Sequence, residues 1–412
     1  MKFQLVFLSL FCCLFCNGQQ NYNVKDFGAV PNDNKDDWEA FQKCINSAIS
    51  QSEIPYIFVP EGEYIISDEL IFDFLEKQVS FVGENKNGKI PIIKSVSKKN
   101  LIWAKGFLFT PSKGIFTIKN FKIIGNNTPY TPAHNKINKA EWNAAILITD
   151  KNQAYVDNVI VENHYGQGIH ISTTQQEGID LSSRFDKVVI QNSKINDVWG
   201  HHPKSDSYGD AIYLSNVKSA EIKNNIIFNN IFRTKQFGRA GIVVEYMAEN
   251  IKIIKNKILG GYDRPLHIEA TYGGHLVENN EFKGSDMGFI IAENLSNQHQ
   301  SSIFRNNIFT NEGLIKDENL RKSYGYGSYG DRALVYIVTN GESSLQMKFE
   351  KNHFIVKDDY EYETNAIINN RSSNIIFESN SFHSGNRKGL GIFNYGKGML
   401  KKNKIQKTIF VK

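Results

Sequence analysis

A six-residue phrase recurs through the second half of the chain and strongly limits what it can fold into. The phrase reads apolar, any, any, Asn, any, apolar. Most of its intervals lie near two dozen residues, and the long one is explained by one period plus an insertion over 311–330. Such a period suits one coil of a solenoid and is too short for a propeller blade, which needs about 40 residues. The asparagines are Asn225, Asn256, Asn280, Asn307, Asn352, Asn380 and Asn403, at intervals of 31, 24, 27, 45, 28 and 23 residues.

A second phrase, small–apolar–any–apolar, falls between copies of the first. Its two-residue alternation is typical of a short β-strand, so each period holds at least two strands separated by turns. No helical pattern interrupts residues 145–412. Strands that stack coil on coil, with an internal asparagine bonded to its counterpart one coil away, describe an all-β parallel β-helix. An antiparallel sandwich is the alternative. The copies begin at Ala145, Gly168, Ala211, Gly241, Pro265, Gly288 and Gly391.

The N-terminal part of the chain carries a family resemblance. YNVKDFGAVPNDNKDDWEAFQKCINSA (22–48), followed by IFVPEGEYIIS (57–67), resembles the opening of the pectate-lyase-like, right-handed β-helix superfamily. In that superfamily an Asp-Phe-Gly-Ala turn and an Asp-Asp-x-x-Ala-Phe helix cap one end of the solenoid. The resemblance implies one β-helix domain over 19–412, with the cap and first coils in 22–85 and coils with loop insertions in 86–412. It also implies polysaccharide chemistry of several kinds (lyase, hydrolase or epimerase), among which the fold does not choose.

The capping helix is also sensible physically. Asp36 or Asp37 can cap the start of an amphipathic helix whose Trp38, Phe41 and Ile45 cover the first coil. An uncovered first coil would expose a sheet edge.

Residues 1–18 have the features of a secretory signal peptide: Lys2, an apolar run and a small residue, Gly18, at the end. A lipoprotein leader acylated at Cys16 is the less favoured alternative, because Phe15 is bulky for such a site. We therefore expect a secreted or periplasmic protein. Only Cys44 remains after the leader, so no internal disulfide can form. No segment has the 18 apolar residues of a membrane span.

The net charge of +5 is mild and permits an acidic polysaccharide or oligosaccharide as substrate. Basic residues are scattered among Asn and Asp, and no nucleic-acid-binding module is recognisable. We expect a monomer that binds no nucleic acid.

Polar residues gather on the outward face of the middle coils. In the second phrase the two apolar residues point inward and the residue between them points outward. The outward column therefore reads Leu147, His170, Tyr213, Val243, His267 and Ile290, and a second column reads Thr149, Ser172, Ser215, Glu245, Glu269 and Ala292. Asp210, Arg239, Asp263 and Arg264 flank the same strands. The coincidence of Tyr213, Glu245, His267 and Glu269 in adjacent columns predicts a functional groove, although any one of them alone would pass for solvated surface.

Long connections support a groove at this position. The insertion between Ile171 and Ala211 contains Trp199, Lys204 and Tyr208, whose rings and charge suit sugar faces and anionic groups.

Two reactions fit the groove. In β-elimination on a uronic acid, Tyr213 and His267 would supply acid and base, and Arg239 or Arg264 would hold the carboxylate. In hydrolysis, Glu245 and Glu269 would be the two carboxylates, or Asp210 with either of them. The Tyr, His and Arg content favours elimination, as a lyase or a dehydratase. A non-catalytic glycan-binding scaffold and epimerisation remain as further alternatives. Clustered carboxylates such as Glu245 and Glu269 also suit Ca²⁺, although no spaced Asp/Asn loop predicts a dedicated site.

Overall fold

The computed structural model describes residues 21–97, 99–106, 114–136, 142–175, 180–201, 207–284, 288–293, 301–311, 333–340, 347–357, 366–386 and 388–412. The predicted leader (1–18) and Lys204 lie outside these residues. Among the described residues, no helix is long and apolar enough to cross a bilayer.

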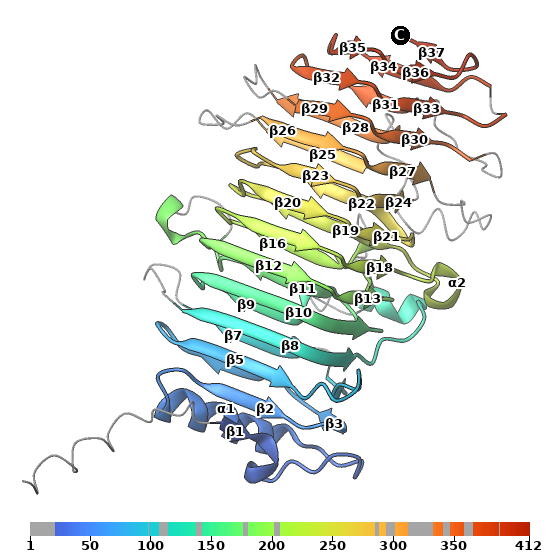
Figure 1. Ribbon diagram of the computed structural model, residues 1–412. Coiled ribbons are helices and arrows are strands. Elements are labelled where there is room, and N and C mark those ends of the chain that lie inside the picture. Colours follow the sequence, from blue (N-terminus) through green and yellow to red (C-terminus); the bar gives the residue numbers. More distant parts are fainter. Residues whose placement is uncertain are drawn as a thin grey trace, which may run out of the picture.

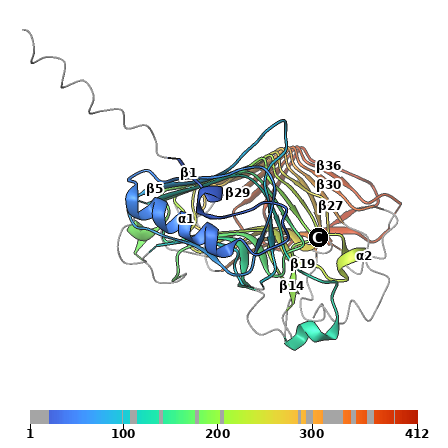
Figure 2. The same cartoon turned by 90° about the horizontal axis from the view of Figure 1, so that it is seen from below.

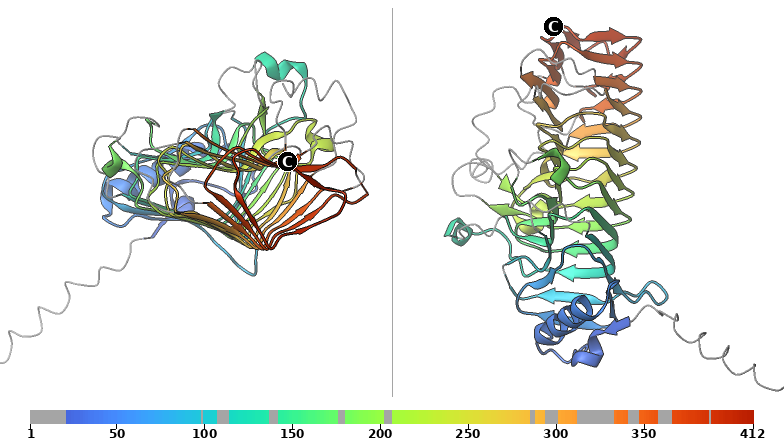
Figure 3. Two further views of the ribbon diagram at one scale, coloured as in Figure 1. Left: turned by 90° about the horizontal axis from the view of Figure 1, so that it is seen from above. Right: turned by 90° about the vertical axis from the view of Figure 1, so that its left-hand side faces the viewer.

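The strands stack in three parallel ladders that run from one end of the molecule to the other (Figures 1 and 3). A typical coil adds one strand to each ladder. The first and second ladders join through the long strands β8 and β10, whereas the third forms a separate sheet. Because each connection leads from one parallel strand to the next, right-handed winding is expected. The predicted right-handed parallel β-helix with an N-terminal capping helix is confirmed.

The first ladder consists of β1 (Asn21–Asn23), β2 (Tyr56–Val59), β5 (Gln78–Gly83), β8 (Ile115–Ile124), β10 (Gln153–Glu162), β12 (Lys187–Gln191), β17 (Ala220–Lys223), β20 (Ile251–Ile254), β23 (Leu276–Glu278), β26 (Ser302–Arg305), β29 (Met347–Glu350), β32 (Ile375–Glu378) and β35 (Met399–Lys401). The second, beside the ends of β8 and β10, consists of β3 (Glu63–Ile66), β6 (Ile92–Ser95), β13 (Lys194–Asn196), β18 (Ile226–Phe228), β21 (Lys257–Ile258), β24 (Glu281–Gly284), β27 (Ile308–Asn311), β30 (His353–Ile355), β33 (Ser381–His383) and β36 (Lys404–Ile405). The third consists of β4 (Leu70–Asp73), β7 (Ile102–Lys105), β9 (Ala144–Thr149), β11 (Gln167–Ser172), β16 (Ile212–Ser215), β19 (Gly238–Glu245), β22 (Tyr262–Ile268), β25 (Gly288–Glu293), β28 (Ala333–Asn340), β31 (Ala366–Asn370), β34 (Gly391–Asn394) and β37 (Phe410–Val411).

The repeated asparagines form the internal ladder that the sequence predicts. Asn280 is representative: its Nδ2 donates to Asn307 Oδ1 at 2.9 Å and to the carbonyl of Ile253 at 2.8 Å. Its Oδ1 accepts from Asn256 N at 2.8 Å and from Asn256 Nδ2 at 3.1 Å. The same bonds link Asn225 through to Asn403, so the prediction is confirmed.

A left-handed residue comes directly before each ladder asparagine, with φ between 52° and 58°. It makes the tight turn between the strands of the first and second ladders. Asn tolerates this conformation better than most residues, whereas Lys and Ser adopt it at a cost. These residues are Asn224, Lys255, Asn279, Asn306, Lys351, Ser379 and Lys402.

Phenylalanines continue the core towards the C-terminal end, where they stack on each other from coil to coil. Phe309 lies 5.2 Å from Phe282 and 5.0 Å from Phe354 between ring centroids, and Phe354 lies 4.9 Å from Phe382. The last apolar position of the asparagine phrase thus points inward in every one of these coils.

Helix α1 (Trp38–Gln51) closes the N-terminal end and buries Phe41, Cys44 and Ile45 against the first coil (Figure 1). The carboxylate of Asp36 accepts the Trp38 N–H at 3.1 Å, whereas that of Asp37 accepts the Val30 N–H at 2.8 Å. Asp36 is therefore the residue whose side chain caps the helix.

Two expectations about the coils are wrong. The insertion after Asn230 begins with a short helix, α2 (Ile231–Thr234), because Asn230 accepts the Arg233 N–H and caps it. The strand β25 is also one residue out of the expected register, since His267 pairs with Phe289 and not with Ile290. A second insertion forms the antiparallel pair β14 (Gly200–His201) and β15 (Ser207–Tyr208). Viewed along the stack in Figure 2, α2 and β14 project on the same side as β19.

Candidate active site

The candidate active site lies on four neighbouring strands of the third ladder: β11, β16, β19 and β22. Parallel pairing places His170 beside Tyr213, Tyr213 beside Val243 and Val243 beside His267. Ser215 is likewise paired with Glu245. Up to His267, the predicted outward column is therefore confirmed.

Glu245, the last residue of β19, connects the coils on either side of its own. Its Oε2 accepts the Tyr213 hydroxyl at 2.8 Å, and its Oε1 lies 3.3 Å from His267 Nε2. Arg239 NH2 is 3.6 Å from the same Oε1. Because Val243 separates Tyr213 from His267 in the column, Glu245 is the group that couples them.

These contacts keep Glu245 ionised. Burial alone would raise the pKa of the Glu245 carboxyl, but the hydrogen bonds and charges of His267, Arg239 and Tyr213 outweigh burial and lower this pKa to about 2. Burial and the neighbouring charge of Glu245 raise the pKa of Tyr213 well above its ordinary value. The pair is therefore a carboxylate and a neutral phenol at neutral pH.

Arg239 is held mainly by Asp210. Its Nε and NH2 each lie 2.8 Å from one carboxylate oxygen of Asp210, a bidentate arrangement. Asp210 is fully buried, and the Arg239 side chain is 15% exposed. Gln167 adds a further hydrogen bond to Asp210, at 3.1 Å. The guanidinium predicted to receive a substrate carboxylate is thus already bound to a carboxylate of the protein.

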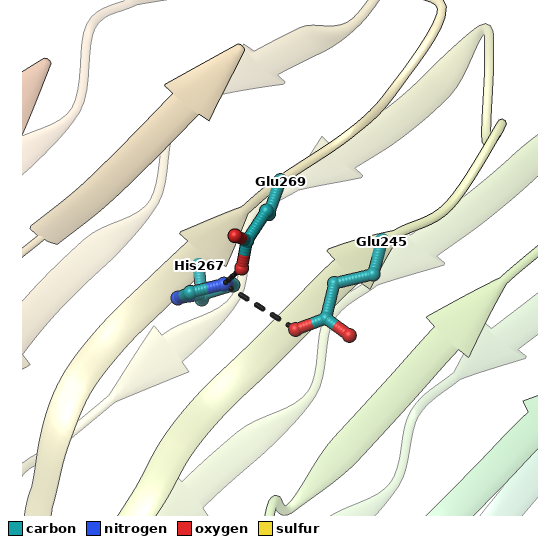
Figure 4. Close-up of side chains that lie close together, drawn as sticks. All are labelled: Glu245, His267 and Glu269. Carbon is teal, nitrogen blue, oxygen red and sulfur yellow. Dashed lines mark hydrogen bonds and ion pairs between the residues drawn. The ribbon is translucent and has the colours of Figure 1, made fainter. Parts of the chain in front are cut away.

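Glu269 is the accessible member of the group. It follows β22, its side chain is 35% exposed, and its Oε2 lies 2.7 Å from His267 Nε2. The exposed fractions of the His267 and Glu245 side chains are only 4% and 8%. Figure 4 shows His267 between the two carboxylates. A ligand on this face would therefore contact Glu269 first.

Other predicted residues have supporting positions. The ring of His170 lies 4.5 Å from that of Tyr213, and its Nε2 lies 2.7 Å from Ser172 Oγ. Burial lowers the pKa of His170 to about 3, so this imidazole is neutral at neutral pH. Arg264 and Asp263 are both buried on β22, with Arg264 Nε 3.9 Å from Asp263 Oδ2, and their charges offset each other.

The predicted aromatic contact with sugars is wrong for Trp199. Its side chain is 1% exposed, because its ring packs against those of Tyr130, His134 and Tyr165. This contact set holds the inserted loop to its neighbours. Tyr208 belongs to β15, and its side chain, like all of Lys204, lies outside what the structure describes.

Sequence reasoning missed Gln167, which links His170 to Asp210. Its amide oxygen lies close to His170 Nδ1, and its Nε2 bonds Asp210. The alternation of β11 predicts an inward side chain at this position, so no sequence signal marks Gln167 as a site residue.

The arrangement can perform acid–base chemistry, and it also resembles a metal-binding set. One ligand atom each of Glu245, His267 and Glu269 lies within 4.8 Å of the other two. A mixed carboxylate and imidazole set suits Zn²⁺ or Mn²⁺ better than Ca²⁺, which prefers oxygen ligands alone.

The chain has no significant match among curated proteins. Its fold resembles the catalytic unit of a GH87 α-1,3-glucanase from Streptomyces thermodiastaticus, with 15% identity over 95% of this chain and 70% of the other, and a TM-score of 0.54. It also resembles the surface adhesin PfbA of Streptococcus pneumoniae (14% identity, 94% and 91% covered, TM-score 0.55). A third similar structure is the A-module of a mannuronan C-5 epimerase from Azotobacter vinelandii (13% identity, 93% and 99% covered, TM-score 0.51).

These similarities concern the fold, since the identities are low and the three proteins differ in what they do. The family is decided by sequence. A family model described as rhamnogalacturonase A/epimerase, pectate lyase-like, matches residues 21–329, which includes the cap and every residue of the candidate active site. The chain belongs to this rhamnogalacturonase A/epimerase, pectate lyase-like family.

Proposed function

We propose that this protein is a carbohydrate-active enzyme that hydrolyses glycosidic bonds, with Glu245 and Glu269 as its two carboxylates. The observation that carries the proposal is their spacing, since an oxygen of each lies within 4.8 Å of the other. Retaining glycosidases place their carboxyl groups about 5–5.5 Å apart, whereas inverting enzymes leave about 6.5–9.5 Å for a water molecule. We therefore expect retention of the anomeric configuration.

The environments of the two carboxylates support different roles. Glu245 is kept ionised by Tyr213, Arg239 and His267, as a nucleophile must be. Glu269 is the more exposed and lies beside His267, which suits the group that protonates the leaving oxygen and later activates water. His267 holds the two carboxylates in position and is itself nearly inaccessible.

The charge of the group also favours hydrolysis over elimination. Asp210, Glu245 and Glu269 supply three carboxylates, and Arg239 is the guanidinium bound among them. The carboxylate of a uronate substrate would be repelled by these negative charges, and the contacts just described include no cation that is free to bind it. A neutral sugar at the cleavage point would not be repelled.

β-Elimination is the second candidate, because Tyr213 and His267 both contact the same carboxylate. It requires Tyr213, which is more deeply buried than Glu245 (2% against 6% exposed), to reach the leaving oxygen. It also requires Arg239 or Arg264 to exchange its present partner for substrate. Epimerisation would need the same proton abstraction and meets the same obstacles. A non-catalytic glycan-binding protein would bind a glycan at this face without any of these roles.

One experiment separates these candidates. The protein is incubated with neutral and uronic-acid polysaccharides and their oligosaccharides, and new reducing ends are measured beside the ultraviolet absorbance of unsaturated uronates. Glu245→Gln and Glu269→Gln should each lower the appearance of reducing ends by about 10²–10⁴-fold. Glu278→Gln, which removes a carboxylate paired with Arg305 on the first ladder, is the matched control and should leave the rate unchanged.

Each other outcome identifies a different function. Absorbance that is abolished by Tyr213→Phe and His267→Ala would establish elimination, and the product mass would then distinguish a lyase from a dehydratase. Exchange of the C-5 proton without cleavage would establish epimerisation. Binding without turnover on every glycan would leave a non-catalytic scaffold.

A further inference from the structure

The net positive charge of this chain comes from its C-terminal coil. After Glu378 the chain contains eight Lys and Arg residues and no Asp or Glu. The whole chain has 48 basic and 43 acidic side chains, so residues 1–378 hold 40 and 43 and carry a net charge of −3. The overall value of +5 therefore hides an acidic body with one strongly basic end.

The basic residues of this end are accessible. Seven of its lysines are exposed. In the described part of the chain none of them lies within ion-pair distance of an Asp or Glu carboxylate, although the charges of Lys401 and Lys402 act on Glu378 in the neighbouring strand. An excess of like charges on one coil raises the local potential and attracts anions. These lysines are Lys388, Lys397, Lys401, Lys402, Lys404, Lys407 and Lys412.

The same end exposes apolar and aromatic side chains. Tyr395, Met399, Phe410 and Val411 are 44–49% exposed. The rings of Phe393 and Tyr395 lie 5.8 Å apart, and Lys412 Nζ lies 5.7 Å from the centre of the Tyr395 ring. At the opposite end, helix α1 covers the first coil, whereas Figure 1 shows β35, β36 and β37 at the C-terminal end with no described helix over them.

We propose that this surface, the last coil from Lys388 to Lys412, binds a linear polyanion, and that its ligand is an acidic polysaccharide. Exposed lysines would pair with carboxylate or sulfate groups, and the exposed rings of Tyr395 and Phe410 would stack on sugar faces. The same end of a second copy fits poorly, because two such ends would repel each other. Lysines on an edge also discourage unwanted strand addition, but that role requires no exposed aromatic rings.

The surface is separate from the candidate active site. Along the third ladder, β37 lies five strands beyond β22. At about 4.8 Å per strand, the separation is about 24 Å. A polymer bound at this end would therefore keep its unbound segments, including any neutral sugars, near Glu269, while the segment held by the lysines stays outside the site. This inference does not depend on which reaction Glu245 and Glu269 perform.

The test measures binding of the full chain to three ligands by isothermal titration calorimetry. The ligands are sodium polygalacturonate, neutral dextran, and vesicles of phosphatidylcholine and phosphatidylglycerol in equal parts. The variant is Lys401→Gln/Lys404→Gln/Lys412→Gln. Its matched control, Lys25→Gln/Lys35→Gln/Lys86→Gln, removes the same charge from exposed positions near the opposite end. Thermal unfolding of both variants establishes that the fold is intact.

At low salt we expect the C-terminal variant to bind polygalacturonate roughly tenfold more weakly, with the difference disappearing at high salt, because exposed charges interact weakly and are screened. Dextran should not bind at this surface, and Tyr395→Ala should weaken polygalacturonate binding. Equal binding by the two triple variants would overturn the proposal, as would stronger binding to the vesicles than to polygalacturonate. Turnover is not measured, so failure here leaves the proposed hydrolysis untouched.

Discussion

Removal of an internal asparagine of the ladder should lower the free energy of unfolding more than removal of the last one. Asn280→Ala deletes four hydrogen bonds: two donated to Ile253 O and Asn307 Oδ1, and two accepted from the backbone and side chain of Asn256. Asn280 is 2% exposed, so water cannot replace them. At about 1 kcal/mol for each bond, we expect a loss of about 4 kcal/mol in the free energy of unfolding.

The end of the ladder provides the comparison. Asn403 accepts two bonds from Asn380, donates one to Phe377 O and is half-buried. Water can replace part of this set, so Asn403→Ala should cost about 1 kcal/mol. Urea unfolding followed by circular dichroism measures both values.

A third variant tests whether the hydrogen bonds of the ladder are the cause of the stabilisation. Asn280→Asp keeps the side-chain shape but turns a carboxylate oxygen towards the oxygens of Ile253 and Asn307, and it buries a charge. It should be less stable than Asn280→Ala. If Asn280→Ala cost no more than Asn403→Ala, or if Asn280→Asp were the more stable of the two Asn280 variants, the ladder could not be the source of the stabilisation.

Three other results are expected. Ionised Glu245 should stabilise the fold by about 3 kcal/mol, because its pKa is lowered from 4.5 to about 2. This stabilisation is complete above a pH of about 4.5 and is lost as the pH falls towards about 2. Glu245→Gln should therefore flatten the acid part of the pH–stability curve, and an unchanged curve would contradict the lowered pKa of Glu245. EDTA should leave hydrolysis unchanged, because the proposed chemistry needs only carboxylates and His267; loss of activity that Zn²⁺, Mn²⁺ or Ca²⁺ restores would instead identify a metal enzyme. Lys255→Asn should raise the free energy of unfolding by roughly 0.5 kcal/mol, since Lys255 has a φ of 56°, a conformation in which Asn is several-fold enriched; a lower urea midpoint would show that this turn is not strained.

The fold could be predicted because its signal is repeated. Each copy of the asparagine phrase specifies an inward apolar residue, a left-handed turn and an internal amide, and the copies agree with one another. The outward column from His170 to His267 follows from the same alternation. The exception is β25, where the strand is shifted by one residue. Phe289, Ile290 and Ile291 are all apolar, so alternation cannot decide between the two registers.

The site was only partly predictable, because its contacts cross between coils and depend on insertions. Sequence reasoning placed Glu245, His267 and Glu269 together correctly. The partners of Arg239 could not be foreseen, because they depend on where Asp210 lies at the end of the inserted loop. Trp199 shows the same limit: an aromatic residue in a polar insertion resembles a sugar contact until the packing of Tyr130, His134 and Tyr165 is known.

Because the coils are equivalent, the distance between the candidate active site and the basic C-terminal end can change without any change in the residues of either surface. Asn280 and Asn307 each make the same bonds to the coil before and the coil after. Excision or duplication of one whole period between them would therefore rejoin the ladder, because nearest neighbours are the main interactions in a solenoid. Each such event would move the basic end by about 4.8 Å relative to Glu269. Gene-level gain or loss of coils could in this way match the protein to polymers whose anionic groups are differently spaced.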